Sequence, residues 1–139
     1  LFATTEGLAT WLAPVAAIDL RPGGMWEASY NRDAQLGDDG NIRNRVIVFA
    51  PERMLAIQVA HAPPNFPHAD IVGELATLIE FEPVGAAQTR VRVSMFGYGE
   101  GEGFDVLHRH FAWGNAATLD ALAARVANGP TDWNAEARP

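Results

Sequence analysis

The sequence predicts an α+β domain in which a curved antiparallel sheet wraps around one long C-terminal helix. Three observations predict this class. Residues 104–127 have the apolar periodicity of a long amphipathic helix. About six strand-like runs precede that helix, and a short helix precedes them. No βαβ pattern occurs, so a parallel sheet is disfavoured.

The first elements are a short helix over residues 4–12 and a short strand. Thr4 or Thr5 can cap this helix, and Glu6 in its first turn suits the positive end of the helix dipole. Proline follows at position 14 and ends the helix. Residues 18–20 then read as a strand that ends at the Arg-Pro-Gly-Gly turn signal.

The other strand-like runs are rich in β-branched and aromatic residues. They are residues 25–31, 42–49, 54–60, 74–83 and 89–98. An Asp-Asp-Gly turn at residues 38–40 predicts a hairpin between the first two of these runs. Residues 62–70 contain three prolines, which cannot donate ladder hydrogen bonds, so this segment is expected to be a loop. Phe66 would anchor that loop or act as a lid.

One face of the 104–127 helix forms a continuous stripe. On a helical wheel with about 100° per residue, the members of this stripe point within about 60° of one common direction. They are Leu107, His108, Phe111, Asn115, Leu119, Leu122 and Val126. Polar groups on this face would meet whatever lies between helix and sheet. Asn-Gly-Pro at residues 128–130 ends the helix. We therefore expect one domain over residues 1–128 and a loose tail over 129–139 that carries Trp133.

The composition excludes several functional classes. The net charge is −7, the pI is about 4.9, and the basic residues are scattered arginines, which argues against nucleic acids and anionic membranes. No apolar run is long enough for a transmembrane helix. The absence of cysteine excludes disulfides and thiol nucleophiles. We expect a cytoplasmic protein, while a strand or targeting segment upstream of Leu1 remains an open alternative.

No cofactor or metal is expected. The glycine-rich segment 97–103 lacks the GxGxxG spacing, and its two glutamates would repel phosphate, so it reads as a connector. His108 and His110 point about 200° apart on a helix and cannot share a metal. We expect His110 to lie on the plain surface. Glu27 is expected to pair with an arginine of the adjacent strand, Arg43 or Arg45, and not to act in catalysis.

Several strings resemble one family. They are TEGLATWL at residues 5–12, DLRPGG at 19–24, PERML at 51–55, TRVRV at 89–93 followed by GYG at 97–99, and FAWGN at 111–115. Together they resemble the START/Bet v 1-like (SRPBCC) superfamily. Within it, they resemble the bacterial relatives of the activator of Hsp90 ATPase. The similarity spans roughly residues 3–126.

The resemblance implies a helix-grip fold of the Bet v 1-like kind, with a cavity between sheet and C-terminal helix. The family fold begins with a strand before the first helix, whereas this chain starts at Leu1-Phe2, almost at the helix. The sheet would then have an uncovered edge, which makes a homodimer one option. The family has no shared catalytic residues, so the fold alone does not define the function.

We expect the cavity to bind a small hydrophobic or amphipathic molecule. The residues expected to line it are Trp11, Trp26, Ile57, Phe81, Phe96, Leu107 and Phe111, and those expected to orient the ligand are His61, Tyr98, His108 and Asn115. One alternative is a cyclase or hydrolase that uses His61 or His108 as a general base. Another is a co-chaperone-like protein whose partner contacts Trp113 on the outer helix face.

Overall fold

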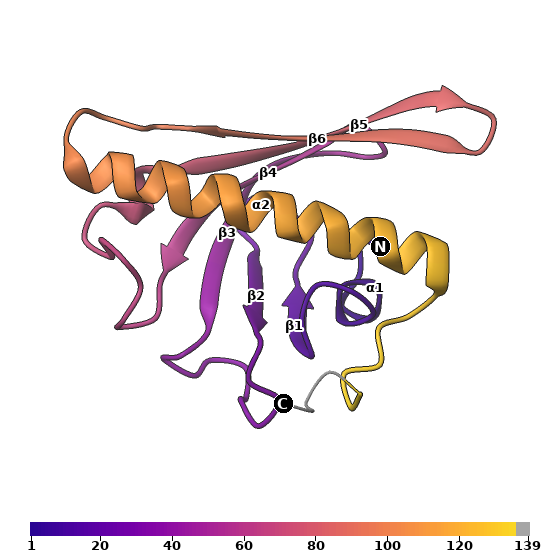
Figure 1. The fold of residues 1–139 in the computed structure, drawn as a ribbon, viewed down its shortest axis with the longest axis horizontal. Coiled ribbons are helices and arrows are strands. Elements are labelled where there is room, and N and C mark those ends of the chain that lie inside the picture. The colour runs from indigo at the N-terminus through magenta and orange to yellow at the C-terminus, as the bar shows by residue number, and fades with distance from the viewer. Residues whose placement is uncertain (136–139) are drawn as a thin grey trace.

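The computed structural model describes residues 1–135 and confirms the predicted architecture. Six antiparallel strands form one curved sheet in the order β1-β2-β3-β4-β5-β6. The strands are β1 Val15–Ile18, β2 Met25–Ser29, β3 Ile42–Ala50, β4 Met54–His61, β5 Ala76–Gly85 and β6 Gln88–Phe96. The helices are α1 Thr5–Ala9, the short 3-10 helix η1 Val72–Glu74 and α2 Glu102–Asn128. Figure 1 shows α2 lying across the open side of the sheet.

The first strand lies earlier than the sequence predicts. It spans Val15–Ile18 in place of residues 18–20, because the chain already turns at Asp19. There the Arg21 N–H donates to the Asp19 carbonyl at 2.9 Å. The preceding helix has its expected cap, since the Gly7 N–H donates to Thr4 Oγ1 at 2.9 Å.

The last strand ends two residues earlier than predicted, at Phe96. Gly97 has φ 95, a left-handed conformation that favours glycine. A Cβ at this position would overlap the Glu74 carbonyl oxygen, so the chain passes closely over the end of η1. Segment 97–103 therefore begins with a fixed reversal that directs α2 back across the sheet.

The core lies on the concave side of the sheet, beneath α2 and beside α1. Its largest cluster contains Leu8, Trp11, Ala16, Trp26, Val46, Leu55, Ile57, Ile79 and Leu122. A smaller cluster of Val72, Leu75 and Leu107 packs beneath the first half of α2. The two clusters lie beneath different halves of the helix.

Two register shifts interrupt the β3–β4 pairing, one near Arg43 and one near Val46. Irregularities of this kind bend a strand.

The prediction that Glu27 pairs with an arginine of the adjacent strand is wrong. The register places Glu27 opposite Arg43, but the carboxylate accepts from the Gly37 N–H at 2.6 Å and from Asn41 Nδ2 at 2.7 Å. Arg43 donates to the Gly37 carbonyl instead, at 2.9 Å. Glu27 is only 8% exposed, and a buried carboxylate needs hydrogen-bond donors. The Gly37 N–H and the short Asn41 side chain supply them without ordering a long arginine side chain. Segment 30–41 is thus a folded loop built on Glu27.

The C-terminal segment is not loose over residues 131–135. Trp133 Nε1 donates to the Ala9 carbonyl at 2.7 Å, and the Thr131 N–H donates to the Thr10 carbonyl at 2.8 Å. Arg125 of α2 also donates to Thr10 Oγ1 at 2.9 Å. These contacts attach the end of α2 to the end of α1. Residues 136–139 of the expected tail lie outside the described residues.

Asn41→Ala is expected to destabilise the fold by about 2–3 kcal/mol, because it removes a donor from a buried carboxylate. Asn41 is fully buried and also donates to the Gln35 carbonyl at 2.6 Å. Urea unfolding measures the change. Asn31→Ala, in the exposed part of the same loop, is the control and should change the free energy of unfolding by less than about 0.5 kcal/mol. Equal effects of the two variants would contradict a supporting role for Asn41.

Candidate functional site

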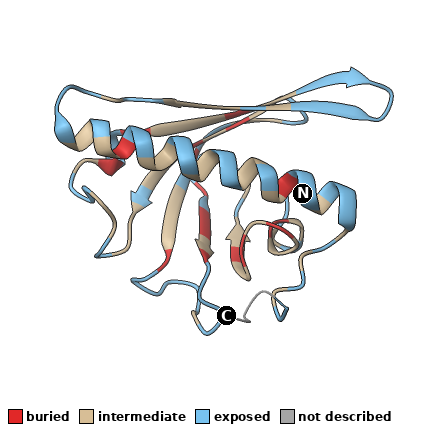
Figure 2. Ribbon diagram, in the orientation of Figure 1, coloured by how far each residue is buried: buried red, intermediate tan, exposed pale blue. Residues whose placement is uncertain are grey.

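Helix α2 is buried at two separated positions. Leu107 and Leu122 are its buried residues, and they lie about 22 Å apart along the axis at about 1.5 Å per residue. Figure 2 shows the rest of the helix as intermediate or exposed. Burying a leucine side chain contributes about 1.5–3 kcal/mol, so these two contacts can hold the helix over the sheet. Two cavities border the helix, one between these two leucines and one at Leu122 and beyond it.

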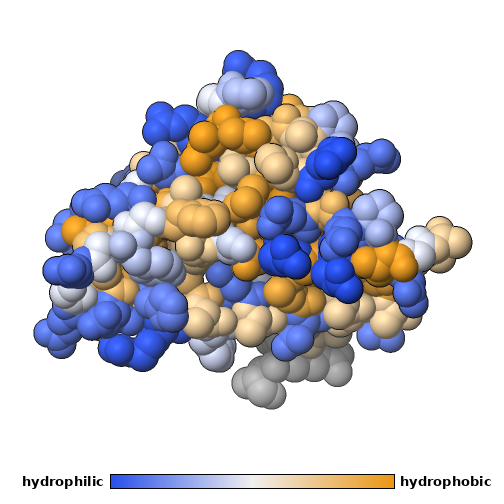
Figure 3. Space-filling model, turned by 90° about the horizontal axis from the view of Figure 1, so that it is seen from above, coloured by the Kyte–Doolittle hydropathy of each residue, from blue (hydrophilic) through white to orange (hydrophobic). Residues whose placement is uncertain are grey.

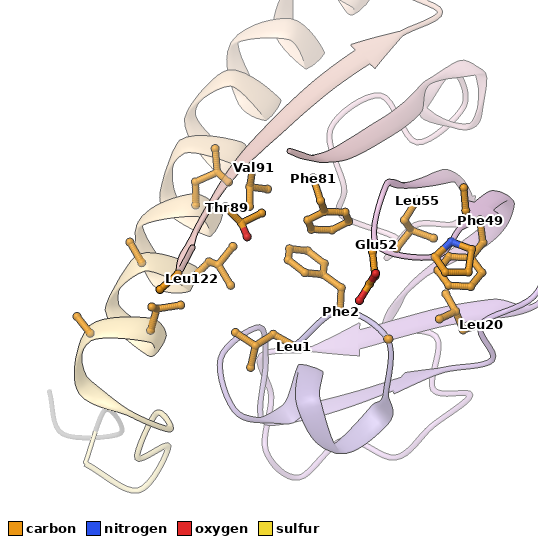
Figure 4. A pocket seen from close by; sticks show the side chains of 18 residues that line it. Leu1, Phe2, Leu20, Phe49, Glu52, Leu55, Phe81, Thr89, Val91 and Leu122 are labelled. Atoms are coloured by element: carbon orange, nitrogen blue, oxygen red, sulfur yellow. The ribbon is translucent and has the colours of Figure 1, made fainter. Parts of the chain in front are cut away.

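The larger opening beneath α2 is a cavity of about 850 Å³. It lies between the second half of α2, the strands β3 to β6 and the first residues of the chain (Figure 4). Its lining residues are Leu1, Phe2, Ala3, Leu20, Phe49, Ala50, Pro51, Glu52, Leu55, Phe81, Ala87, Thr89, Val91, Leu119, Leu122, Ala123, Val126 and Ala127. The wall is apolar except at Glu52 and Thr89, so it suits a molecule with little polar surface.

Aromatic rings shape one wall of the large cavity. The Phe2 ring packs edge-on against Trp11 and against Phe81, with centroid distances of 5.0 Å in both pairs. Trp11 is buried in the core, whereas Phe2 and Phe81 are half-buried and face the cavity. Phe2 therefore joins the core to the cavity wall.

A second, smaller cavity of about 370 Å³ lies beneath the first half of α2. Its lining residues are Val93, Met95, Tyr98, His108, Phe111, Ala112, Asn115, Ala116 and Leu119. The Tyr98 and His108 rings meet edge-on at 5.2 Å, and the Tyr98 hydroxyl donates to Met95 Sδ at 3.6 Å. Burial raises the pKa of the Tyr98 phenol, and its hydroxyl is a hydrogen-bond donor at neutral pH. Leu119 lines both cavities.

The predicted stripe of α2 faces the sheet. His108, Phe111 and Asn115 line the small cavity, and Leu122 and Val126 line the large one. Of the residues predicted to contact a ligand, the structure therefore brings Tyr98, His108, Phe111 and Asn115 together, and places Phe81 in the neighbouring cavity. Their role in binding stays a prediction.

The other predicted ligand contacts line neither cavity. Trp11, Trp26, Ile57 and Leu107 are packed in the two core clusters. Phe96 is 55% exposed. His61 lies at the end of β4, where its Nε2–H donates to the Asp39 carbonyl at 2.9 Å.

Sequence reasoning missed several residues of the large cavity, including Phe2, Phe49, Leu55 and Glu52. The available signal was the second half of the helix stripe. Leu119, Leu122 and Val126 belong to the stripe, but the expected site used only its first half.

Loop 62–70 is anchored on α2 by Phe66. The Phe66 ring packs edge-on against His110 at 5.0 Å and lies 6.0 Å from the Phe111 ring. His110 is therefore half-buried and not plain surface, whereas His108 is exposed at the small cavity. Within residues 1–135, no group of three His, Asp or Glu side chains is placed to hold a metal ion.

The curved six-stranded sheet, the long C-terminal helix and the short first helix define a helix-grip domain. A family model described as "Activator of Hsp90 ATPase homolog 1-like protein" matches residues 1–127, so the chain belongs to this family. The predicted resemblance is thereby confirmed.

A solved structure supports the same fold. The chain is similar to the "Solution structure of the Aha1 dimer from Colwellia psychrerythraea", with a TM-score of 0.63 and 21% identity over 91% of this chain and 83% of that one. No curated protein matches the chain. Among the described helices, none has the length and apolar character needed to cross a membrane.

Proposed function

We propose that this protein binds a small hydrophobic or amphipathic molecule between α2 and the sheet. The single observation that supports this most strongly is the apolar cavity of about 850 Å³. Ligand sites for small molecules typically measure about 300–1,000 Å³ and have mainly apolar walls. Each CH₂ group that such a ligand buries contributes about 0.8 kcal/mol.

The small cavity supports the amphipathic form of this proposal. Its Tyr98, His108 and Asn115 side chains offer hydrogen bonds, while Leu119 adjoins the large apolar cavity. An elongated ligand with its apolar part against Phe81 would reach His108 with a hydrogen-bonding group at one end. No carboxylate lines the small cavity among the described residues. We therefore favour ligand binding over acid–base catalysis by a histidine as the function of this site.

Ala123→Phe is expected to weaken binding of a neutral fluorescent apolar probe, N-phenyl-1-naphthylamine, by at least about tenfold, because the ring would occupy the large cavity. Probe fluorescence during titration measures the affinity. Ala124→Phe is the matched control, since Ala124 is exposed on the same helix and lines neither cavity. The same loss in both variants, or in neither, would argue against the cavity as the binding site.

A second candidate function is co-chaperone-like binding to Hsp90. Membership of the Hsp90 activator family favours it, and so does Trp113, which is 74% exposed on α2. Exposed tryptophans are frequent at protein interfaces. Figure 3 shows that hydrophobic side chains also reach the surface in separate groups on the face seen from above.

Trp113→Ala is expected to lower affinity for purified Hsp90 by at least about tenfold if this surface is the interface. Surface plasmon resonance measures the affinity. Arg109→Ala, an exposed change one turn earlier on the helix, should have less effect. If the wild-type chain does not bind Hsp90, this second function is wrong, and the ligand proposal is unaffected.

A homodimer is also proposed. Within residues 1–135, β6 pairs on one side only, with β5, so its other edge is free to hydrogen-bond a second chain. The similar Colwellia structure is titled a dimer. Light scattering over a range of concentrations is expected to give twice the monomer mass at high concentration. A constant monomer mass would contradict the proposal.

A further inference from the structure

We propose that the large cavity selects apolar molecules that carry a positive charge, such as alkyl or aryl amines, and that the Glu52 carboxylate recognises this charge. The inference rests on the proposed ligand-binding function and specifies its ligand class. Glu52 is the only carboxylate among the residues that line either cavity in the described part of the chain, and the one basic side chain, His108, lies in the small cavity. The remaining wall of the large cavity is apolar apart from Thr89.

The carboxylate of Glu52 is available to a ligand. Among residues 1–135, the structure shows no hydrogen bond or ion pair to it; the two ion pairs join Arg21 to Asp19 and Arg90 to Glu82. The chain as a whole carries a net charge of −7, which attracts cations and repels anions over the same surface. A free carboxylate at an apolar cavity therefore favours a cationic ligand over an anionic one.

The backbone fixes Glu52 at the rim of the cavity. Glu52 lies in the turn between β3 and β4 with φ 61, a left-handed conformation. The Arg53 N–H donates to the Ala50 carbonyl at 3.1 Å and closes this turn. The Phe81 N–H donates to the Arg53 carbonyl at 2.9 Å and ties the turn to β5. Figure 4 shows the Glu52 side chain directed toward the space that the Phe2 and Phe81 rings border.

The rings beside Glu52 match the same ligand class. Phe2, Phe49 and Phe81 all line the large cavity. The face of an aromatic ring attracts a cation, by about 0.5–1 kcal/mol at exposed sites. An ammonium group near Glu52 would thus lie beside a carboxylate and close to aromatic rings, while its alkyl or aryl part occupies the apolar space. A neutral ligand of equal length would gain only the apolar contact.

Three probes of equal chain length test the inference: decylamine, decan-1-ol and decanoate, titrated below their micelle concentrations at pH 7. An alkylamine is protonated at this pH, as the ordinary lysine pKa of about 10.4 indicates. We expect decylamine to bind about fivefold tighter than decanol, which corresponds to about 1 kcal/mol, and decanoate to bind more weakly than decanol. Isothermal titration calorimetry measures all three affinities.

Glu52→Gln should abolish the preference for the amine and leave decanol affinity unchanged, because it removes the charge and keeps the shape. Glu100→Gln is the matched control. It makes the same charge change at an exposed residue that lines neither cavity, and it should keep the preference. Glu52→Asp retains the charge and should also keep it, so the test does not depend on one variant folding.

The outcomes separate the two proposals. If none of the three probes binds the wild-type protein, the ligand-binding function itself is contradicted. If decanol and decylamine bind with equal affinity, or if decanoate binds tightest, the cavity binds ligands but the charge inference is overturned. The inference is also overturned if Glu52→Gln and Glu100→Gln reduce the amine preference equally, because the effect then belongs to net charge and not to Glu52.

Discussion

The attachment of α2 at two distant points is the constraint on which the rest of the structure depends. Leu107 packs with Val72 and Leu75, and Leu122 packs with the main core. A helix supported along its whole length would close the concave side of the sheet. The small cavity lies between Leu107 and Leu122, whereas the large cavity is lined by Leu122 itself and by helix residues on both sides of it, from Leu119 to Ala127. The apolar stripe of α2 thus borders both cavities, while its two buried leucines hold it over the sheet.

The amino-acid sequence predicts the elements well because their signals are local. The 3.6-residue period of the stripe from Leu107 to Val126 orients α2, and alternation with glycine and proline turns marks the strands. The cavity is different, since an apolar residue such as Phe49 or Ile57 has the same pattern whether it meets a neighbour or an empty volume. Whether the space is filled depends on the summed side-chain volumes of many segments.

Contacts between different segments of the chain could not be predicted from the sequence either. The donors to Glu27 come from a loop whose course no periodicity specifies, so the adjacent arginine was the natural but incorrect expectation. Trp133 docks on Ala9, and His110 packs on Phe66, through pairings that bring together parts of the chain far apart in sequence. In each case, the sequence pattern does not specify which residues meet.

The position of Val126 has a kinetic consequence. This residue lines the large cavity but is 71% exposed, and Leu1 beside the same space is also exposed. The cavity thus opens to solvent near the C-terminal end of α2. A ligand of the proposed kind would enter and leave there by displacing side chains, without separating strands or lifting the helix. For the proposed ligand, such an open route would favour rapid exchange and short residence times.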